Sequence, residues 1–293
     1  MKNDFPAALL KTLFAFQQSE ITEYEVYRRL ALFEKNPHNQ KVLLRIAEDE
    51  RGHANFWKGF TKKEVYPNWW RVGVFTWIAR ILGLTFGVRL MERGEEQAQK
   101  NYKGVLPQIP DARKIMEDEE RHEQQLVGCL NERKLQYVGS VVLGLNDALV
   151  ELTGALAGLT FALQNAKLIA IVGLITGIAA SFSMAASEYL STKNEPEHGK
   201  SAGTSAFYTG LAYIITVMLL IMPYLVQPNY FLALGLMFAV ALFIIFAFNF
   251  YIAVAKNEHF FKRFFEMASI SLGVAALSFG IGIVVRMWLG VAA

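Results

Sequence analysis

The sequence has a single cysteine, Cys129, among its 293 residues, which excludes an intramolecular disulfide framework. A lone cysteine is typical of a reducing compartment. The chain also lacks a basic stripe and the arginine–aromatic interleaving of nucleic-acid-binding proteins, so we expect no nucleic-acid partner. The opening residues, MKNDFPAALLKTLFAF, have no small-residue cleavage site after their apolar patch, so we expect no signal peptide.

Charge is scarce in the second half of the chain. Of the 55 charged residues, 41 lie in residues 1–137 and only 14 in residues 138–293. Hydropathy predicts five membrane spans in this second half, near residues 138–164, 168–191, 206–226, 231–255 and 267–292. The first half shows helical periodicity and few strand signals. We therefore predict an all-α protein with a polar domain over residues 1–135 and a membrane domain over residues 136–293.

The positions of the basic residues predict the orientation of these spans. Five of them follow the second and fourth spans, namely Lys193, Lys200, Lys256, Lys262 and Arg263. The loops after the first and third spans hold only Lys167. We expect the spans to lie in the cell (inner) membrane. Since cytoplasmic loops are enriched in lysine and arginine, we expect the N-terminal domain on the cytoplasmic side of this membrane and the C-terminus on the outer side.

Two carboxylates interrupt the first span, LGLNDALVELTGALAGLTFAL. Asp147 and Glu151 are four residues apart, so they share one helix face, one turn apart. A carboxylate within a bilayer costs a few kcal/mol unless it is paired, hydrated or protonated, and it commonly marks an ion path. In the second span, Met184 and Glu188 repeat the same spacing in SFSMAASEYLS. These four residues are our candidates for a transport path.

A thioether combined with carboxylates favours Fe²⁺ or Mn²⁺ over Mg²⁺ or Ca²⁺, which gain nothing from sulfur. Taken singly, Met184 is better explained as core filling and Glu188 as a residue at headgroup level. The glycines of GALAG and GLITG in the two spans are best explained by helix packing. Four polar or soft groups on one hairpin nevertheless favour a cation path.

The first half of the chain contains a duplicated Glu-x-x-His motif. Glu50 and His53 form the first copy in IAEDERGHANFW, and Glu119 and His122 form the second in MEDEERHEQQL. One helical turn separates each carboxylate from its imidazole, so both can bind one metal pair. One copy is a weak signal, but two copies are typical of four-helix bundles that hold two metal ions.

Such a bundle needs two more carboxylates from its other helices. Glu20 precedes Tyr27 by seven residues, and Glu95 precedes Tyr102 by the same interval, so the two halves of the bundle look like repeats. Glu92, one turn before Glu95, is a seventh candidate ligand. We assign the other glutamates to a solvated face, namely Glu23, Glu25, Glu48, Glu117 and Glu123.

An aromatic and basic stretch separates the two motif copies. Residues 66–90 contain three tryptophans together with Arg71, Arg80 and Arg89, and no uncharged run there is long enough to span a bilayer. This composition predicts an amphipathic helix at the membrane interface. A helix buried in a dimer contact is the competing interpretation.

The two halves together resemble a rubrerythrin-type ferritin-like domain fused to a vacuolar iron transporter domain, a combination sometimes called membrane-bound ferritin. The resemblance covers residues 10–290 and is carried by the paired Glu-x-x-His motifs, LGLNDALVELTGALAGLTFAL and SFSMAASEYLS. It implies a cytosolic di-iron domain joined to a homodimeric, five-span transporter that exchanges Fe²⁺ or Mn²⁺ for protons across the lipid bilayer. It also implies that Asp147, Met184 and Glu188 line the path.

The sequence departs from that resemblance in two places. Thr176 stands where plant and parasite relatives carry another glutamate, and the loop TKNEPEHGKSAGT replaces their long glutamate-rich insert. We therefore interpret Glu151 as the candidate substitute for the missing acid, and the N-terminal bundle as the substitute for the insert.

Three functions remain open at this stage. The first is a divalent-metal exporter whose bundle collects, senses or oxidises iron. The second is a membrane-tethered di-iron oxidase or peroxidase with the spans as an anchor, although an anchor needs no intramembrane acids. The third, an iron store, is disfavoured because five spans would prevent a closed soluble shell.

Overall fold

The computed structural model describes residues 5–91, 93, 105–129, 137–194 and 200–289. Within these ranges all regular secondary structure is helical, which confirms the predicted all-α class. The chain divides into two compact units, Met1–Glu132 and Arg133–Ala293.

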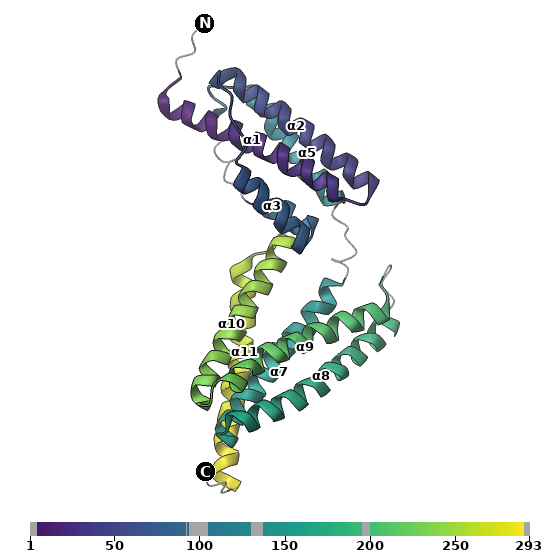
Figure 1. Ribbon diagram of the computed structural model, residues 1–293, viewed down its shortest axis with the longest axis vertical. Coiled ribbons are helices and arrows are strands. Elements are labelled where there is room, and N and C mark those ends of the chain that lie inside the picture. Colours follow the sequence, from purple (N-terminus) through teal and green to yellow (C-terminus); the bar gives the residue numbers. More distant parts are fainter. Residues whose placement is uncertain (1–4, 92, 94–104, 130–136, 195–199, 290–293) are drawn as a thin grey trace. The chain divides into compact units, whose positions relative to one another are not determined.

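Unit 1 contains the helices α1 (Ala7–Phe33), α2 (Pro37–Thr61), α3 (Trp69–Leu82) and α5 (Ala112–Cys129), shown in purple to teal in Figure 1. Helix α1 packs against α2 and α3, and α2 also packs against α5. Residues 84–91 are helical as well. Glu92, Glu95 and Tyr102 lie outside the described residues, so the complete four-helix bundle remains a prediction.

Each long helix of unit 1 has a polar layer between two apolar layers. One apolar cluster includes Val26, Tyr27, Ile46 and Leu126, and the other includes Leu13, Phe16, Trp57 and Ile115. On α1, α2 and α5 the predicted metal ligands fall between residues of these two clusters. Apolar packing on both sides therefore fixes the helix faces that carry the ligands and keeps them away from bulk water.

The helix predicted over residues 66–90 is divided in the structure: α3 ends at Leu82, and Gly83, with a φ of 104°, separates it from the helical residues 84–91. The aromatic side chains of α3 are largely exposed. Trp69, Trp70 and Trp77 are 54%, 76% and 65% exposed. Asn68 caps the helix by accepting a hydrogen bond from the Arg71 backbone N–H. Exposed tryptophans on a basic helix are consistent with the predicted interfacial role, which stays a prediction.

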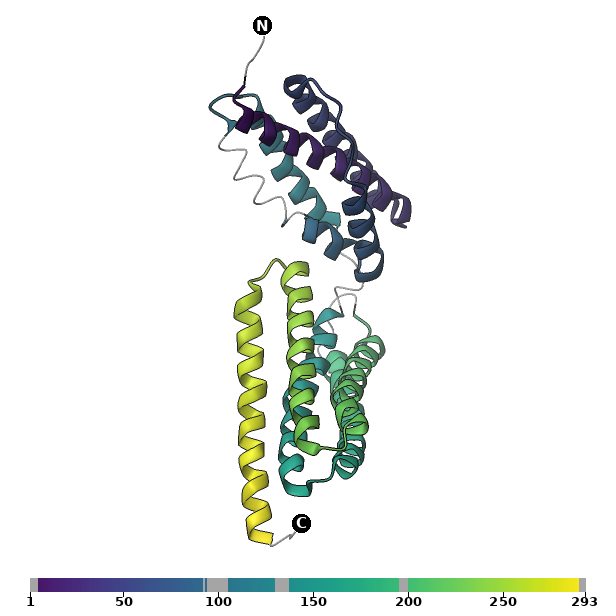
Figure 2. The ribbon, with the colours of Figure 1, turned by 60° about the vertical axis from the view of Figure 1, so that its left-hand side comes forward.

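Unit 2 consists of α7 (Val138–Leu163), α8 (Ala166–Asn194), α9 (Ala202–Val226), α10 (Tyr230–Ala255) and α11 (Phe260–Leu289). All five are long and apolar enough to cross a membrane, which confirms the five predicted spans. Figure 2 shows α10 and α11 running side by side.

The helix that contains the fifth predicted span is longer than the span. The span is predicted from residue 267, whereas α11 begins at Phe260 and contains Lys262, Arg263 and Glu266. Hydropathy loses the signal at these charges, whereas the backbone hydrogen bonds of the helix continue through them.

Helix α7 is central to unit 2, since it contacts each of the other four helices. Glycines allow neighbouring helices to approach α7 closely. A Cβ atom on Gly282 of α11 would lie 2.5 Å from the carbonyl oxygen of Gly158 on α7, and a Cβ atom on Gly144 of α7 would collide with the carbonyl oxygen of Thr209 on α9. The α7 glycines thus pack mainly against α9 and α11. The helix that carries Asp147 and Glu151 is therefore held rigidly from several sides.

Candidate functional site

Four of the predicted bundle ligands converge in unit 1. One potential ligand atom from each of Glu20, Glu50, His53 and Glu119 lies within 4.8 Å of the others. These residues come from α1, α2 and α5, so tertiary packing brings together acids that are up to 99 residues apart in sequence. Glu20, Glu50 and His53 are buried, and Glu119 is only slightly more exposed.

The Nδ1 atom of each motif histidine faces this cluster. His53 Nδ1 lies 3.1 Å from Glu119, 3.3 Å from Glu50 and 3.5 Å from Glu20. His122 Nδ1 lies 3.0 Å from Glu50 Oε1, whereas Glu50 Oε2 faces His53. Glu50 thus lies between the two imidazoles, as a carboxylate that bridges two metal ions would.

The Nε2 atoms of the two histidines point away from the cluster, each toward an aspartate on the opposite helix. His53 Nε2 lies 3.4 Å from Asp118 Oδ2, and His122 Nε2 lies 3.0 Å from Asp49 Oδ2. A carboxylate at this position fixes the ring orientation and the tautomer that leaves Nδ1 free to bind metal.

Sequence reasoning missed Asp49 and Asp118, although the signal was present. The repeat extends beyond Glu-x-x-His, because Glu48-Asp49-Glu50 precedes His53 just as Glu117-Asp118-Glu119 precedes His122. Each aspartate directly precedes a motif glutamate and therefore flanks the same helix face.

The assignment of Glu23 to a solvated face is wrong. Glu23 is only 6% exposed and accepts a hydrogen bond from Ser19 Oγ at 2.7 Å. Desolvation by burial, followed by the charges of Glu20 and Glu119, raises the pKa of Glu23 to about 8. Glu23 lies one turn from Glu20 on α1, on the face that the bundle buries, so it belongs to the edge of the cluster.

Burial perturbs the other acids in the same direction. Desolvation and the charge of Glu50 raise the pKa of Glu119 to about 8, and desolvation also raises the pKa of Glu50. Burial alone would lower the pKa of His53, but its contacts with Glu119, Glu20 and Glu50 outweigh burial and raise it. The metal-free cluster therefore retains protons at neutral pH, and a divalent cation can replace them.

The donor set fits Fe²⁺ or Mn²⁺. Buried carboxylate oxygens and imidazole nitrogens are ligands that both ions accept, and no thiolate faces the cluster among the described residues. Trp57 Nε1 donates to Glu20 Oε1 at 3.2 Å, which orients that carboxylate. Tyr27 is buried in the neighbouring apolar layer.

In unit 2, the predicted path residues take hydrogen bonds from neighbouring helices. Ser140 Oγ donates to Glu188 Oε1 at 2.7 Å, which joins the start of α7 to the end of α8. Tyr213 of α9, which is fully buried, donates its hydroxyl hydrogen to Glu151 Oε2 at 2.9 Å. Among the described residues no hydrogen bond or ion pair joins Asp147 to Glu188.

The bond between Ser140 and Glu188 sets the relative depth of the candidates along the antiparallel pair α7 and α8. Met184 lies one turn deeper than Glu188, by about 6 Å. Asp147 lies seven residues beyond Ser140, and thus about 10 Å deeper than the Glu188 level. Thr176, at the position of the missing acid, donates its hydroxyl to Val172 of its own helix.

Comparison with known families identifies this part of the chain. Residues 138–203 match the VIT family. The match covers α7, α8 and the start of α9, and so includes all four predicted path residues. No curated protein shows significant similarity to the chain. The VIT match and the five apolar helices support a multi-pass membrane protein that is similar to vacuolar iron transporters and transports metal ions.

Proposed function

We propose that the protein moves Fe²⁺ or Mn²⁺ out of the cytoplasm through unit 2 in exchange for protons, and that unit 1 collects, senses or oxidises iron. The observation that carries the transport proposal is that the VIT match falls on the two helices that hold Asp147, Met184 and Glu188. An apolar anchor has no need of these acids.

The path residues are suited to exchanging the two cargoes. A carboxylate that releases a divalent cation can take up a proton at the same oxygen, and this competition couples the two movements. In this proposal Glu188 receives the ion near the helix ends, Met184 supplies a soft sulfur ligand, and Asp147 holds the ion deeper. Glu151, paired with Tyr213, is the candidate for proton release.

In unit 1, a resident metal pair would be held by Glu20, Glu50, His53, Glu119 and His122, with Glu92 and Glu95 as predicted further ligands. When iron is bound there, the pair supplies redox chemistry toward oxygen or peroxide. The protein residues position the ligands: the two aspartates orient the histidines, and Trp57 orients Glu20.

The transport proposal is tested with the full-length protein in liposomes that contain a pH-sensitive dye. An imposed Fe²⁺ or Mn²⁺ gradient should drive metal across the bilayer and protons in the opposite direction. Metal movement without any proton movement would refute the exchange, and the absence of metal movement would refute transport.

The second candidate is a membrane-tethered di-iron oxidase or peroxidase. The buried carboxylate and histidine cluster of unit 1 favours it. Near-ultraviolet absorbance of Fe²⁺-loaded protein should then change on exposure to air. Identical spectra in anaerobic and aerated samples would leave unit 1 as a collector or sensor of metal.

We also propose that the protein forms a homodimer in the bilayer and that α3 lies at the bilayer surface. In support, α8 makes its main contacts with only α7 and α9, and it exposes the apolar residues Ile175 and Phe182. Trp70 and Trp77 on α3 should be quenched by lipids brominated near the headgroup. If α3 instead lies in a dimer contact, these lipids should leave both tryptophans unquenched.

A further inference from the structure

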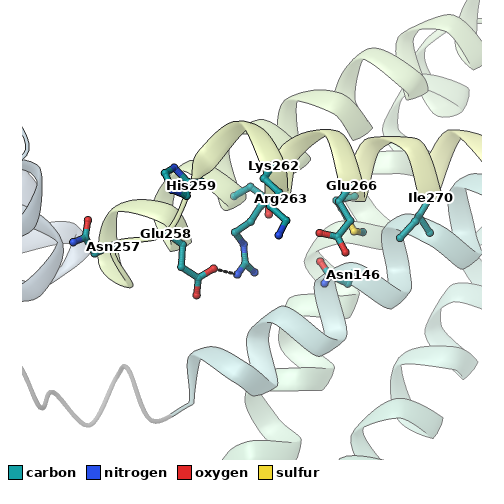
Figure 3. A pocket seen from close by; sticks show the side chains of 10 residues that line it. Asn146, Asn257, Glu258, His259, Lys262, Arg263, Glu266 and Ile270 are labelled. Atoms are coloured by element: carbon teal, nitrogen blue, oxygen red, sulfur yellow. Dashed lines mark hydrogen bonds and ion pairs between the residues drawn. The ribbon is translucent and has the colours of Figure 1, made fainter.

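An open pocket of about 600 Å³, whose lining combines apolar surface with amide and charged side chains, lies within unit 2, on the α10 and α11 side of α7. It is lined by Asn146 of α7, Asn249 of α10, the turn between α10 and α11, and the first turns of α11. Figure 3 shows Glu266 of α11 and Asn146 pointing toward one another across it. None of the four predicted path residues lines this pocket.

Of the two carboxylates that line this pocket, Glu266 is the one available to bind a ligand. Glu258, at the mouth, is ion-paired with Arg263. By contrast, Glu266 makes no hydrogen bond or ion pair with any residue in the described parts of the chain. It lies six residues into a membrane-capable helix, about 9 Å from its start. The side chain of Glu266 is exposed in the pocket, so water solvates its charge until a ligand replaces that water.

The opposite walls supply amide oxygens. Asn249 is 5% exposed, and its Nδ2 donates to the carbonyl of Ile245 on its own helix at 2.8 Å, so its Oδ1 remains as an acceptor. Asn146 adds a second amide, and it directly precedes Asp147. Carboxylate and amide oxygens together are ligands for a hard or borderline divalent cation.

The pocket has room for a hydrated ion. Six waters occupy about 180 Å³ at their liquid volume, so an ion with its first hydration shell fits with room to spare. The ion pair of Glu258 and Arg263 leaves Glu266 and Lys262 as opposite charges one turn apart on α11. No surplus positive charge remains to attract a phosphate or a lipid headgroup.

We propose that this pocket binds a hydrated divalent cation through Glu266, Asn146 and Asn249, and passes it to Asp147. The second step rests on the proposed function, whereas the binding step does not. In this proposal Glu266 binds the hydrated ion at the entrance of the transport path. Asp147 and Met184 then replace water molecules of its hydration shell.

Binding is tested by equilibrium titration with Mn²⁺, read by electron paramagnetic resonance, on full-length protein in lipid nanodiscs. Glu50→Ala and Glu119→Ala are present in every sample to remove binding in unit 1. Glu266→Gln should weaken one Mn²⁺ site by roughly tenfold or more, as expected for loss of a ligand. Glu266→Asp, which keeps the charge, should retain most of the affinity and so exclude misfolding as the cause.

Lys262 provides a control of opposite sign, since it lies one turn from Glu266. Lys262→Gln should tighten Mn²⁺ binding a few-fold, because a nearby positive charge is removed. An unchanged Mn²⁺ titration in Glu266→Gln would overturn the proposal, as would weaker binding in Lys262→Gln.

Transport in liposomes separates this proposal from the proposed function. Glu266→Gln should raise the KM for Mn²⁺ roughly tenfold while kcat stays near the wild-type value. Wild-type transport with normal KM in Glu266→Gln would overturn the pocket and leave the function standing. If the wild-type protein transports nothing but Glu266→Gln still loses Mn²⁺ binding, the function fails and the pocket stands.

Discussion

His122 on α5 places its Nε2 atom 3.0 Å from Oδ2 of Asp49 on α2, while its Nδ1 atom faces Glu50 at the same distance. His53 makes the reciprocal contact with Asp118 at 3.4 Å. Each Glu-x-x-His motif is therefore oriented by the aspartate of the other copy. This reciprocal arrangement gives both imidazoles the same tautomer, with Nδ1 available for metal.

Replacing Asp49 and Asp118 with asparagine should lower the affinity of unit 1 for Mn²⁺ about 10- to 100-fold without removing any direct ligand. The measurement is Mn²⁺ titration of the full-length protein. Glu48→Gln is the matched control, since Glu48 is exposed and forms an ion pair with Arg51. Equal affinities in the asparagine variant and in the control would contradict the orienting role.

Metal binding to unit 1 should release protons and strengthen as the pH rises to about 8. Glu23 and Glu119 have pKa values of about 8, and that of Glu50 is also raised, so these carboxyl groups hold protons that a cation must displace. Proton release is measured with an indicator dye during titration at pH 7. Affinity that is independent of pH between 6 and 8 would contradict the raised pKa values.

The same pKa values give the metal-free protein a pH-dependent stability. Below the ordinary glutamate pKa of 4.5 these carboxyl groups are protonated in both the folded and the unfolded chain; between 4.5 and about 8 only the folded chain keeps its protons. Above that range the folded chain carries several buried carboxylates close together, which repel one another. The free energy of unfolding of unit 1 should therefore fall from pH 5 to pH 8 without metal, and bound Mn²⁺ should reverse this fall. Chemical denaturation at several pH values measures it.

In unit 1, the sequence predicted the residues whose spacing follows a helical turn. Glu50, His53, Glu119 and His122 could be found because each pair lies on one face of one helix. Glu23 was missed because nothing local shows how wide the buried face of α1 is. That width depends on how closely α2 and α5 pack against α1.

The same limit holds in unit 2. Hydropathy predicted the five spans, since long apolar runs leave few alternatives. It could not extend α11 back to Phe260, because Lys262, Arg263 and Glu266 lower the local hydropathy while leaving the helix intact. The pocket around Glu266 combines residues from three helices, so it is visible only after they pack.

The packing of α7 against α11 can be tested with two glycines of the same helix. A Cβ atom on Gly282 would lie 2.5 Å from the carbonyl oxygen of Gly158, whereas one on Gly280 would have no neighbour within 4 Å. Gly282→Ala should cost about 1–3 kcal/mol and lower the thermal unfolding midpoint in detergent. Gly280→Ala should be neutral or slightly stabilising. Equal midpoints in the two variants would contradict the close α7–α11 crossing.

Met184→Leu should weaken Fe²⁺ transport more than Mn²⁺ transport. Leucine keeps nearly the same volume but has no sulfur lone pair, and the harder Mn²⁺ ion gains less from sulfur. The ratio of kcat/KM for the two ions in liposomes should therefore shift several-fold toward Mn²⁺. A proportional loss for both ions would mean that Met184 only fills space in the core that it contacts.

The most direct test of metal–proton exchange is proton movement driven by Fe²⁺ in liposomes that contain either the wild-type protein or Asp147→Asn. Asparagine keeps the size and hydrogen bonding of the side chain but cannot carry the charge or the exchanged proton. The wild-type protein should acidify or alkalinise the lumen according to the direction of the Fe²⁺ gradient. Asp147→Asn should show no such movement, although it still inserts and binds metal in unit 1. Wild-type proton movement in Asp147→Asn would contradict the account and leave unit 2 as an anchor for the metal centre.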